Sequence, residues 1–269
     1  MTVQRNALGR LKERIQVFFQ YQNLLLQMVE RDIKLKYRRS FLGYLWSVLS
    51  PLMTMAVMTV VFSTMFGRGI ENYPVYLLIG NILFGFMRES SMHCITSITG
   101  NAALMKKIYV PKYIFTLSKV TSDFVNLGFS MAALFIVMFV TGTPFTWRCL
   151  LIIIPVFELY LFCIGLGLFL AQAAVFFRDI QYIWGVVCTA WMYLTPIFYP
   201  LENLSVKLQW VITRFNPMYY YITIFRDMTM HNRIGSLTHI YGGALIAILM
   251  LVLGLYSFLK TKDRFILYI

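Results

Sequence analysis

The sequence predicts an all-α integral membrane protein with six transmembrane helices. Of its 269 residues, 59% are hydrophobic, which leaves too little polar surface to cover a water-soluble core. An uncharged run of 26 residues, Phe41 to Phe66, directly follows a stretch that holds five basic side chains and one acidic side chain. About 20 apolar residues in a helix cross the ~30 Å hydrocarbon layer, and basic flanks stay on the cytoplasmic side. This first run is therefore expected to span the membrane with its N-terminal end in the cytoplasm.

The other spans follow from the same reasoning, because apolar runs alternate with charged or turn-forming segments. The six predicted spans cover residues 41–66, 74–99, 113–140, 149–177, 181–198 and 240–259. Pro51 predicts a kink in the first span, and Pro200 ends the fifth. Together the spans form one predicted domain, 41–259, between an N-terminal segment, 1–40, and a C-terminal tail, 260–269.

Two segments outside the spans are expected to lie at the membrane surface. Before the first span, apolar residues recur at helical spacing, which predicts an amphipathic helix in the inner interface. These residues are Leu8, Leu11, Ile15, Phe18, Leu25 and Val29. Residues 201–239 are too polar for a simple crossing and too apolar for a solvated loop, so we expect short interfacial or re-entrant helices there.

Charge sets the predicted orientation. With six spans, 16 basic residues fall on the side of the two termini and six on the other side, so both termini are expected in the cytoplasm. The net charge of +13 would suggest nucleic acid for a soluble protein, but nine of the 24 basic residues precede residue 40 and most others lie between apolar runs. Membrane topology and attraction to anionic lipid explain this charge better than a nucleic-acid partner.

Chemistry-bearing side chains are scarce. The four cysteines lie in or beside apolar runs without metal-ligand spacing, and neither they nor the three histidines suggest a metal site. No nucleophile with its base, and no pair of catalytic carboxylates, can be assembled from the sequence. Acids inside the spans leave one enzymatic alternative, a membrane glycosyltransferase or acyltransferase acting on lipid-linked sugars.

Five charged residues fall inside the predicted spans: Arg88, Glu89, Lys119, Asp123 and Glu158. Such residues face a partner or a watery cavity, because a charge in hydrocarbon is costly. Counting the helical rise puts Asp123 roughly 16 Å into span three from Lys112 at its inner end, and Arg88 roughly 21 Å into span two from its outer end. We therefore predict an Arg88–Asp123 pair, with Lys119 available to Glu89 or Glu158. A structural ion-pair network is favoured over a role in gating or in contacting a pyrophosphate.

Span five carries one stripe of mostly aromatic side chains. Trp184, Cys188, Trp191, Thr195 and Phe198 are separated by offsets of three and four, which places them on one helical face. Aromatic rings can stack on sugar rings, and they also pack well between helices. Periodicity alone favours packing.

Four short motifs occur in a specific order along the chain. They are Lys106-Lys107-Ile108-Tyr109-Val110-Pro111, then Phe176-Phe177-Arg178-Asp179-Ile180, then Thr195-Pro196-Ile197-Phe198-Tyr199-Pro200, and last Asn216-Pro217 followed by Phe225-Arg226. With the stretch from Arg39 to Trp46, this set resembles the membrane subunits of ABC-2 type exporters. It is most similar to the branch that exports bacterial surface polysaccharides such as O-antigen, teichoic acid and capsule. The resemblance covers nearly the whole chain.

The resemblance implies a homodimer of this chain on two ATPase subunits. Its first coupling element would run from Asn101 to Val110, directly before Pro111, and its second would surround Arg178 and Asp179. The residues of the first element with expected contacts are Asn101, Lys106, Lys107, Ile108, Tyr109 and Pro111. The chain has no GxxxxGK[ST] loop, so ATP and Mg²⁺ are expected in the partner and no cofactor is expected here.

The same resemblance implies a substrate path. Aromatic side chains of spans one and five would line a sugar channel, which makes Tyr44, Trp46, Trp184, Trp191 and Phe198 candidates beside their role in packing. Arg38 and Arg39 could attract the pyrophosphate of a lipid-linked polysaccharide, although a purely topological role is favoured. Tyr219, Tyr220 and Tyr221 would form an outer gate or a passive interfacial cap. The expected function is export of an undecaprenyl-pyrophosphate-type glycan, and the alternative within the superfamily is export of a small molecule or drug.

Overall fold

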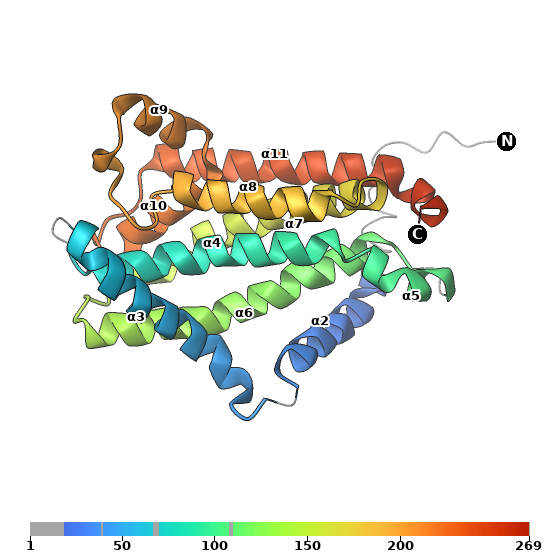
Figure 1. The fold of residues 1–269 in the computed structure, drawn as a ribbon, viewed down its shortest axis with the longest axis horizontal. Coiled ribbons are helices and arrows are strands. Elements are labelled where there is room, and N and C mark those ends of the chain that lie inside the picture. Colours follow the sequence, from blue (N-terminus) through green and yellow to red (C-terminus); the bar gives the residue numbers. More distant parts are fainter. Residues whose placement is uncertain (1–18, 39, 67–69, 108–109, 269) are drawn as a thin grey trace.

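The structure is a bundle of long helices that lie side by side. The computed structural model describes residues 19–268 except 39, 67–69 and 108–109. In this part of the chain every regular element is helical. Helices α4, α6, α7, α8 and α11 run roughly parallel along the bundle, whereas α3 diverges from it at one end (Figure 1). Helix α2 lies obliquely at the end of the bundle that also carries α5 and the C-terminal residues (Figure 1).

The helices have the following bounds. The α-helices are α2 (Gln22–Tyr37), α3 (Trp46–Phe66), α4 (Tyr73–Ile95), α5 (Ala102–Lys107), α6 (Tyr113–Val140), α7 (Ile153–Phe176), α8 (Ile180–Leu194), α9 (Val206–Phe215), α10 (Pro217–Thr229) and α11 (Leu237–Thr261). Short 3-10 helices are η1 (Gly43–Leu45), η3 (Thr99–Asn101), η4 (Trp147–Ile152), η5 (Leu201–Asn203) and η6 (Lys262–Leu267).

Four helical stretches of the described chain are long and apolar enough to cross a membrane. They are Gly43–Thr64, Tyr113–Val140, Trp147–Phe176 and Leu237–Phe265. These stretches overlap the first, third, fourth and sixth predicted spans, and the third agrees at both ends. The protein is therefore a membrane protein. Helix α4 does not meet the same criteria, and α8, at 15 residues, is shorter than they require.

The ends of several helices have local causes. Proline has no N–H to leave unbonded, so Pro217 suits the first turn of α10, and the Asn216 side chain caps that turn by accepting a hydrogen bond from the Met218 N–H at 3.1 Å. Pro74 likewise lies in the first turn of α4. Pro51 lies inside α3, as the sequence predicted.

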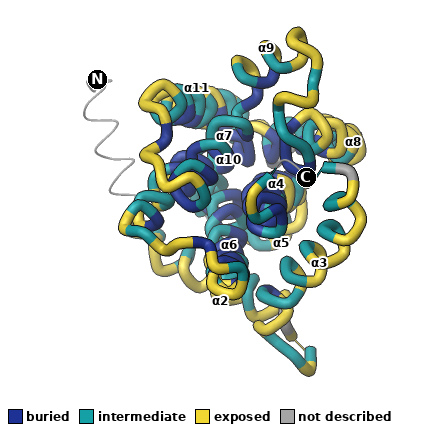
Figure 2. The backbone as a smooth tube through the Cα atoms, turned by 90° about the vertical axis from the view of Figure 1, so that its left-hand side faces the viewer, coloured by how far each residue is buried: buried dark blue, intermediate teal, exposed yellow. Residues whose placement is uncertain are grey.

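Helix α4 forms the centre of the bundle. Sixteen of its 23 residues are buried, and the view along the bundle shows α4 enclosed by its neighbours (Figure 2). Its buried side chains join those of α6 and α7 in one large hydrophobic core. Because protein rather than lipid covers α4, this helix can carry polar residues that a lipid-facing helix would expose at a cost.

Helices α7 and α11 approach each other closely at two glycines. A Cβ atom at Gly165 would collide with the backbone of Met250 and Leu251, and a Cβ at Gly254 would collide with the backbone of Gly165. Small residues at such positions let helix backbones touch inside a membrane, where van der Waals packing replaces the hydrophobic effect as the driving force. The sequence analysis did not identify this contact.

Candidate functional site

One end of the bundle gathers both predicted coupling elements. Helix α5 follows α4 there, and the turn between α7 and α8 lies at the same end (Figure 1). Lys106 and Lys107 are exposed in the last turn of α5, and Arg178 and Asp179 are exposed in the turn. These four charged side chains are exposed at the same end of the bundle. Ile108 and Tyr109 of the same prediction lie outside the described residues.

The first coupling element is held to the bundle at both of its ends. The Asn101 side chain donates to the Ser97 carbonyl at 2.8 Å, and Pro111 is half-buried. The Lys112 ammonium donates to the Lys262 carbonyl at 2.5 Å and lies 5.4 Å from the centre of the Phe265 ring. These contacts tie the start of α6 to the residues that follow α11.

A second hydrophobic core supports this end of the molecule. It joins α2, the α4–α6 connection, α7, α11 and η6. Its buried residues are Met28, Ile98, Ile114, Phe115, Leu168, Ala171, Val175, Phe258 and Phe265. A force applied to α5 or α2 would therefore reach several long helices together.

The charged residues inside the bundle pair differently from the prediction. The Arg88–Asp123 pair is wrong: Asp123 is bonded to His93 Nδ1 at 2.8 Å, and Arg88 is exposed. Lys119 is paired with neither Glu89 nor Glu158 but with Asp32 of α2, at 2.8 Å. Asp123 lies beside His93, which follows Arg88 by five residues, so the partner of Asp123 is about 7.5 Å further along α4 than predicted.

The remaining two acids also differ from expectation. Glu89 is exposed and lies 3.4 Å from the ammonium of Lys36 at the end of α2. Glu158 is buried in α7, and its Oε2 atom has no hydrogen-bond partner in the described structure. Two of the ion pairs therefore connect α2 to the bundle, which the sequence analysis missed because it considered only charges within the spans.

Replacing Lys119 with methionine should loosen α2. The Lys119–Asp32 pair is largely buried, with 24% and 11% of the two side chains exposed, so its loss should cost roughly 1.5–3 kcal/mol. We expect a lower melting temperature for the purified protein and faster proteolysis within α2. The matched control is Lys34→Met, which removes the exposed pair with Glu30 and should change little because water screens that pair. Equal effects of the two substitutions would show that the buried pair does not anchor α2.

The aromatic stripe of α8 faces the bundle rather than its surroundings. The Trp184 indole donates to the Ser91 hydroxyl of α4 at 2.8 Å, and the Trp191 indole donates to the Asn216 side chain at 2.8 Å. Cys188 is fully buried, and Phe198 is 4% exposed. Within this chain the stripe packs α8 against α4 and the start of α10. In α3 and its preceding turn, Tyr44 and Trp46 are 48% and 42% exposed and remain accessible to a ligand.

A buried arginine organises the opposite end of the bundle. Arg226 of α10 is 5% exposed and donates to the carbonyls of Pro196, Tyr76 and Ile197 at 2.8, 3.0 and 3.3 Å. Its guanidinium also lies 3.3 Å from the centre of the Tyr76 ring, a cation–π contact. The arginine thus joins α10, α4 and the segment after α8. The sequence analysis quoted Arg226 only as part of a motif, because Asp227 directly follows it and the segment gave no signal of a buried cation.

The three tyrosines of the predicted outer gate have different surroundings. Tyr221 is fully buried, and its hydroxyl donates to the Gly243 carbonyl at 3.1 Å. Tyr219 and Tyr220 are half-buried and lie edge-on to His239, with ring centres 5.8 and 5.7 Å away. Tyr221 thus joins α10 to α11, whereas Tyr219 and Tyr220 are only partly covered. Arg38 is exposed beyond α2, and Arg39 lies outside the described residues.

The fold and these sites define a helical membrane protein with a charged surface at one end and a tightly fastened segment at the other. The sequence profile of the ABC-2 type transporter matches residues 23–230. The chain belongs to the ABC-2 type transporter family.

Several relatives are similar over nearly their whole length. The O-antigen export system permease protein RfbA of Klebsiella pneumoniae is 30% identical over 247 residues, which cover 90% of this chain and 93% of the relative. The RfbA permease of Myxococcus xanthus is 25% identical over 252 residues, covering 93% and 97%. The polysialic acid transport protein KpsM of Escherichia coli is 22% identical over 246 residues, covering 87% and 91%.

Proposed function

We propose that this chain is the permease subunit of an ATP-driven exporter that moves a lipid-linked polysaccharide across the cytoplasmic membrane. The observation that carries the proposal is end-to-end similarity to O-antigen export permeases from two organisms. The expected cargo is an O-antigen-like or capsule-like glycan on an undecaprenyl-pyrophosphate-type lipid. ATP and Mg²⁺ would be bound by two copies of a separate ATPase, and the permease would act as a homodimer.

The proposal includes six membrane spans in the domain 41–259. At 1.5 Å per residue, the 23-residue α4 is about 35 Å long, enough to cross the hydrocarbon layer, and its neighbours bury most of it, with Arg88 and Glu89 exposed. Helix α8 is shorter, but the buried segment 195–198 continues from it. With six spans, the end that carries α2, α5 and η6 would face the cytoplasm.

Coupling to the ATPase is assigned to the exposed ends of the helices. Lys106 and Lys107 on α5, with Arg178 and Asp179 after α7, would contact the ATPase subunits. Closure of the ATPase dimer would then push on α5 and α2, and the second core would pass the displacement to α7 and α11 as a change between two states of the bundle. Arg38 would attract the pyrophosphate of the arriving substrate.

The test is to deplete the protein in its host and measure lipid-linked glycan on each side of the cytoplasmic membrane. We expect accumulation inside and loss outside, restored by the native protein. The charge reversal Lys106→Glu with Lys107→Glu should not restore export, because it would oppose docking, whereas the control Lys207→Glu at the other end should restore it. If glycan synthesis falls without a change in distribution, a membrane enzyme is favoured. If neither changes, small-molecule export becomes the better explanation.

A further inference from the structure

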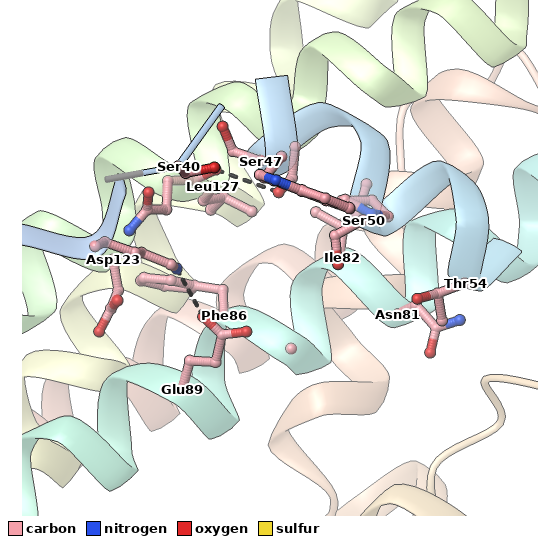
Figure 3. A pocket seen from close by; sticks show the side chains of 16 residues that line it. Ser40, Ser47, Ser50, Thr54, Asn81, Ile82, Phe86, Glu89, Asp123 and Leu127 are labelled. Carbon is pink, nitrogen blue, oxygen red and sulfur yellow. Dashed lines mark hydrogen bonds and ion pairs between the residues drawn. The ribbon is translucent and has the colours of Figure 1, made fainter. Parts of the chain in front are cut away.

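A polar cavity lies between α3, α4 and α6, away from the aromatic stripe of α8. Its volume is about 500 Å³, within the usual range of small-molecule sites. Figure 3 shows its walls: Ser47, Ser50 and Thr54 come from α3, Asn81 and Glu89 from α4, and Asp123 from α6. Ten of the 16 lining residues carry a polar or charged side chain, although α3 and α6 are apolar enough to span a membrane.

The α3 wall presents its polar groups in one direction. Ser47, Ser50 and Thr54 are spaced by three and four residues, so they share one face of the helix. That face lies toward α4 and α6, and Pro51 beside it removes one backbone donor from the same turn. The Ser47 hydroxyl donates to the Tyr44 carbonyl, and its oxygen can still accept from a ligand, as the Ser50 and Thr54 hydroxyls can.

One donor in the cavity lacks a partner. The Nδ2 atom of Asn81 is buried and makes no hydrogen bond within the described structure. Leaving such a donor unsatisfied destabilises a fold, so its retention on the central helix suggests a partner from outside the chain. A hydroxyl or ring oxygen of a ligand would supply the missing acceptor.

The charges of the cavity select against anions. Lys36 is its one lining cation within the described residues, and that lysine is already paired with Glu89 at 3.4 Å. Asp123 adds a second carboxylate, 5% exposed. Each carboxylate already has a partner, Lys36 for Glu89 and His93 for Asp123, so the described walls offer no unpaired cation to phosphate, uronic acids or sialic acid, but carboxylate oxygens accept well from neutral hydroxyls. Trp46 and Phe86 add aromatic surface on which the apolar face of a sugar ring can rest.

We propose that this cavity binds a neutral sugar ring of the exported glycan as the chain passes the cytoplasmic half of the permease. The inference rests on the proposed export function and adds to it a binding position and a selectivity. The cavity would favour neutral over acidic sugars, in contrast to the acidic polymer named for the KpsM relative.

Cysteine protection tests the proposal on the purified full-length permease in a detergent without a sugar headgroup. All four native cysteines are buried, so a water-soluble maleimide should react selectively with Ser50→Cys. Maltotriose should slow that reaction severalfold, whereas a trisaccharide of galacturonic acid should not. The control Asn203→Cys, exposed near α9, should react at the same rate with or without either sugar.

A second variant separates a binding role from a structural one. Asn81→Leu in the Ser50→Cys background should weaken maltotriose protection roughly two- to tenfold, the effect of one lost hydrogen bond. It should also keep or raise the melting temperature, because an unsatisfied donor is removed. Three outcomes would overturn the proposal. They are equal protection by both sugars, no protection by either sugar, and protection only by phosphatidylglycerol vesicles. Normal export by Asn81→Leu with unchanged protection would reject the sugar site alone, whereas failure of the native protein to export any glycan would reject the proposed function.

Discussion

Gly165→Ala is expected to destabilise the protein strongly, although alanine is the better helix former. An added Cβ at Gly165 would collide with the backbone of Met250 and Leu251, which cannot move aside as a flexible side chain can. Helices α7 and α11 would have to separate along their contact. Overpacking of this kind costs roughly 1–3 kcal/mol, and we expect the upper part of that range or loss of folded protein. The measurement is the melting temperature in detergent, with the yield of monodisperse protein.

Gly128→Ala in α6 is the matched control for this substitution. The site around Gly128 is open, with no atom near the added Cβ, so only the helix propensity should change. That change favours alanine by about 1 kcal/mol, and the control should therefore be neutral or slightly stabilising. Opposite signs for the same chemical change would establish the close contact of α7 and α11. If Gly165→Ala were as stable as the control, the two helices would not touch there.

Arg226→Gln is expected to release the segment between α8 and α10 from its contacts with α10, and to abolish transport. The three carbonyls that Arg226 bonds would lose a charged donor, and each such hydrogen bond contributes roughly 1.5–3 kcal/mol. Arg226→Lys should fail almost as badly, because one ammonium cannot reproduce the planar fork of a guanidinium. The measurements are the melting temperature and export of glycan in cells that lack the native protein.

Arg233→Gln provides the control for charge, since Arg233 is exposed just beyond α10. It should preserve stability and export. An alternative is that Arg226 is merely tolerated as a buried cation, in which case an apolar replacement such as Arg226→Met would stabilise the protein. We expect instead that Arg226→Met is as damaging as Arg226→Gln, because methionine has no donor and the single short amide of glutamine cannot reach all three carbonyls.

The sequence was most informative about features that depend only on the order of residues along the chain, such as the position and length of apolar helices. Length and hydropathy located the helix at Tyr113–Val140 with both ends right, and they placed the other long helices within a few residues. The predicted segment 74–99 matches helix α4 to within a few residues, although Arg88 and Glu89 interrupt its apolar run. The first span begins as a short 3-10 helix, Gly43–Leu45, before α3, a change of backbone that apolar composition does not reveal.

Side-chain pairing inside the bundle could not be read from depth alone. Counting the helical rise brought Arg88 and Asp123 to similar levels, but a helix turns by about 100° per residue, so depth leaves the direction of each side chain undetermined. His93 lies five residues after Arg88 and points toward α6, where it meets Asp123. The partner of Lys119 was missed for another reason, since Asp32 belongs to a helix outside the predicted spans. Contacts between backbones, as at Gly165 and Gly254, leave still less trace, because the sequence holds 16 glycines and only some of them lie against another helix.

The second core also sets an order of assembly. Phe265 follows every long helix and is fully buried in the same cluster as Met28 of α2. During synthesis, α2 therefore emerges from the ribosome long before Phe265, which completes the hydrophobic core around it. The surface carrying α2 and α5 would reach its final structure only after α11 has inserted, so an incompletely synthesised chain would not yet present that surface. Premature recruitment of a partner to an incomplete chain would thus be avoided by the order in which the chain is made.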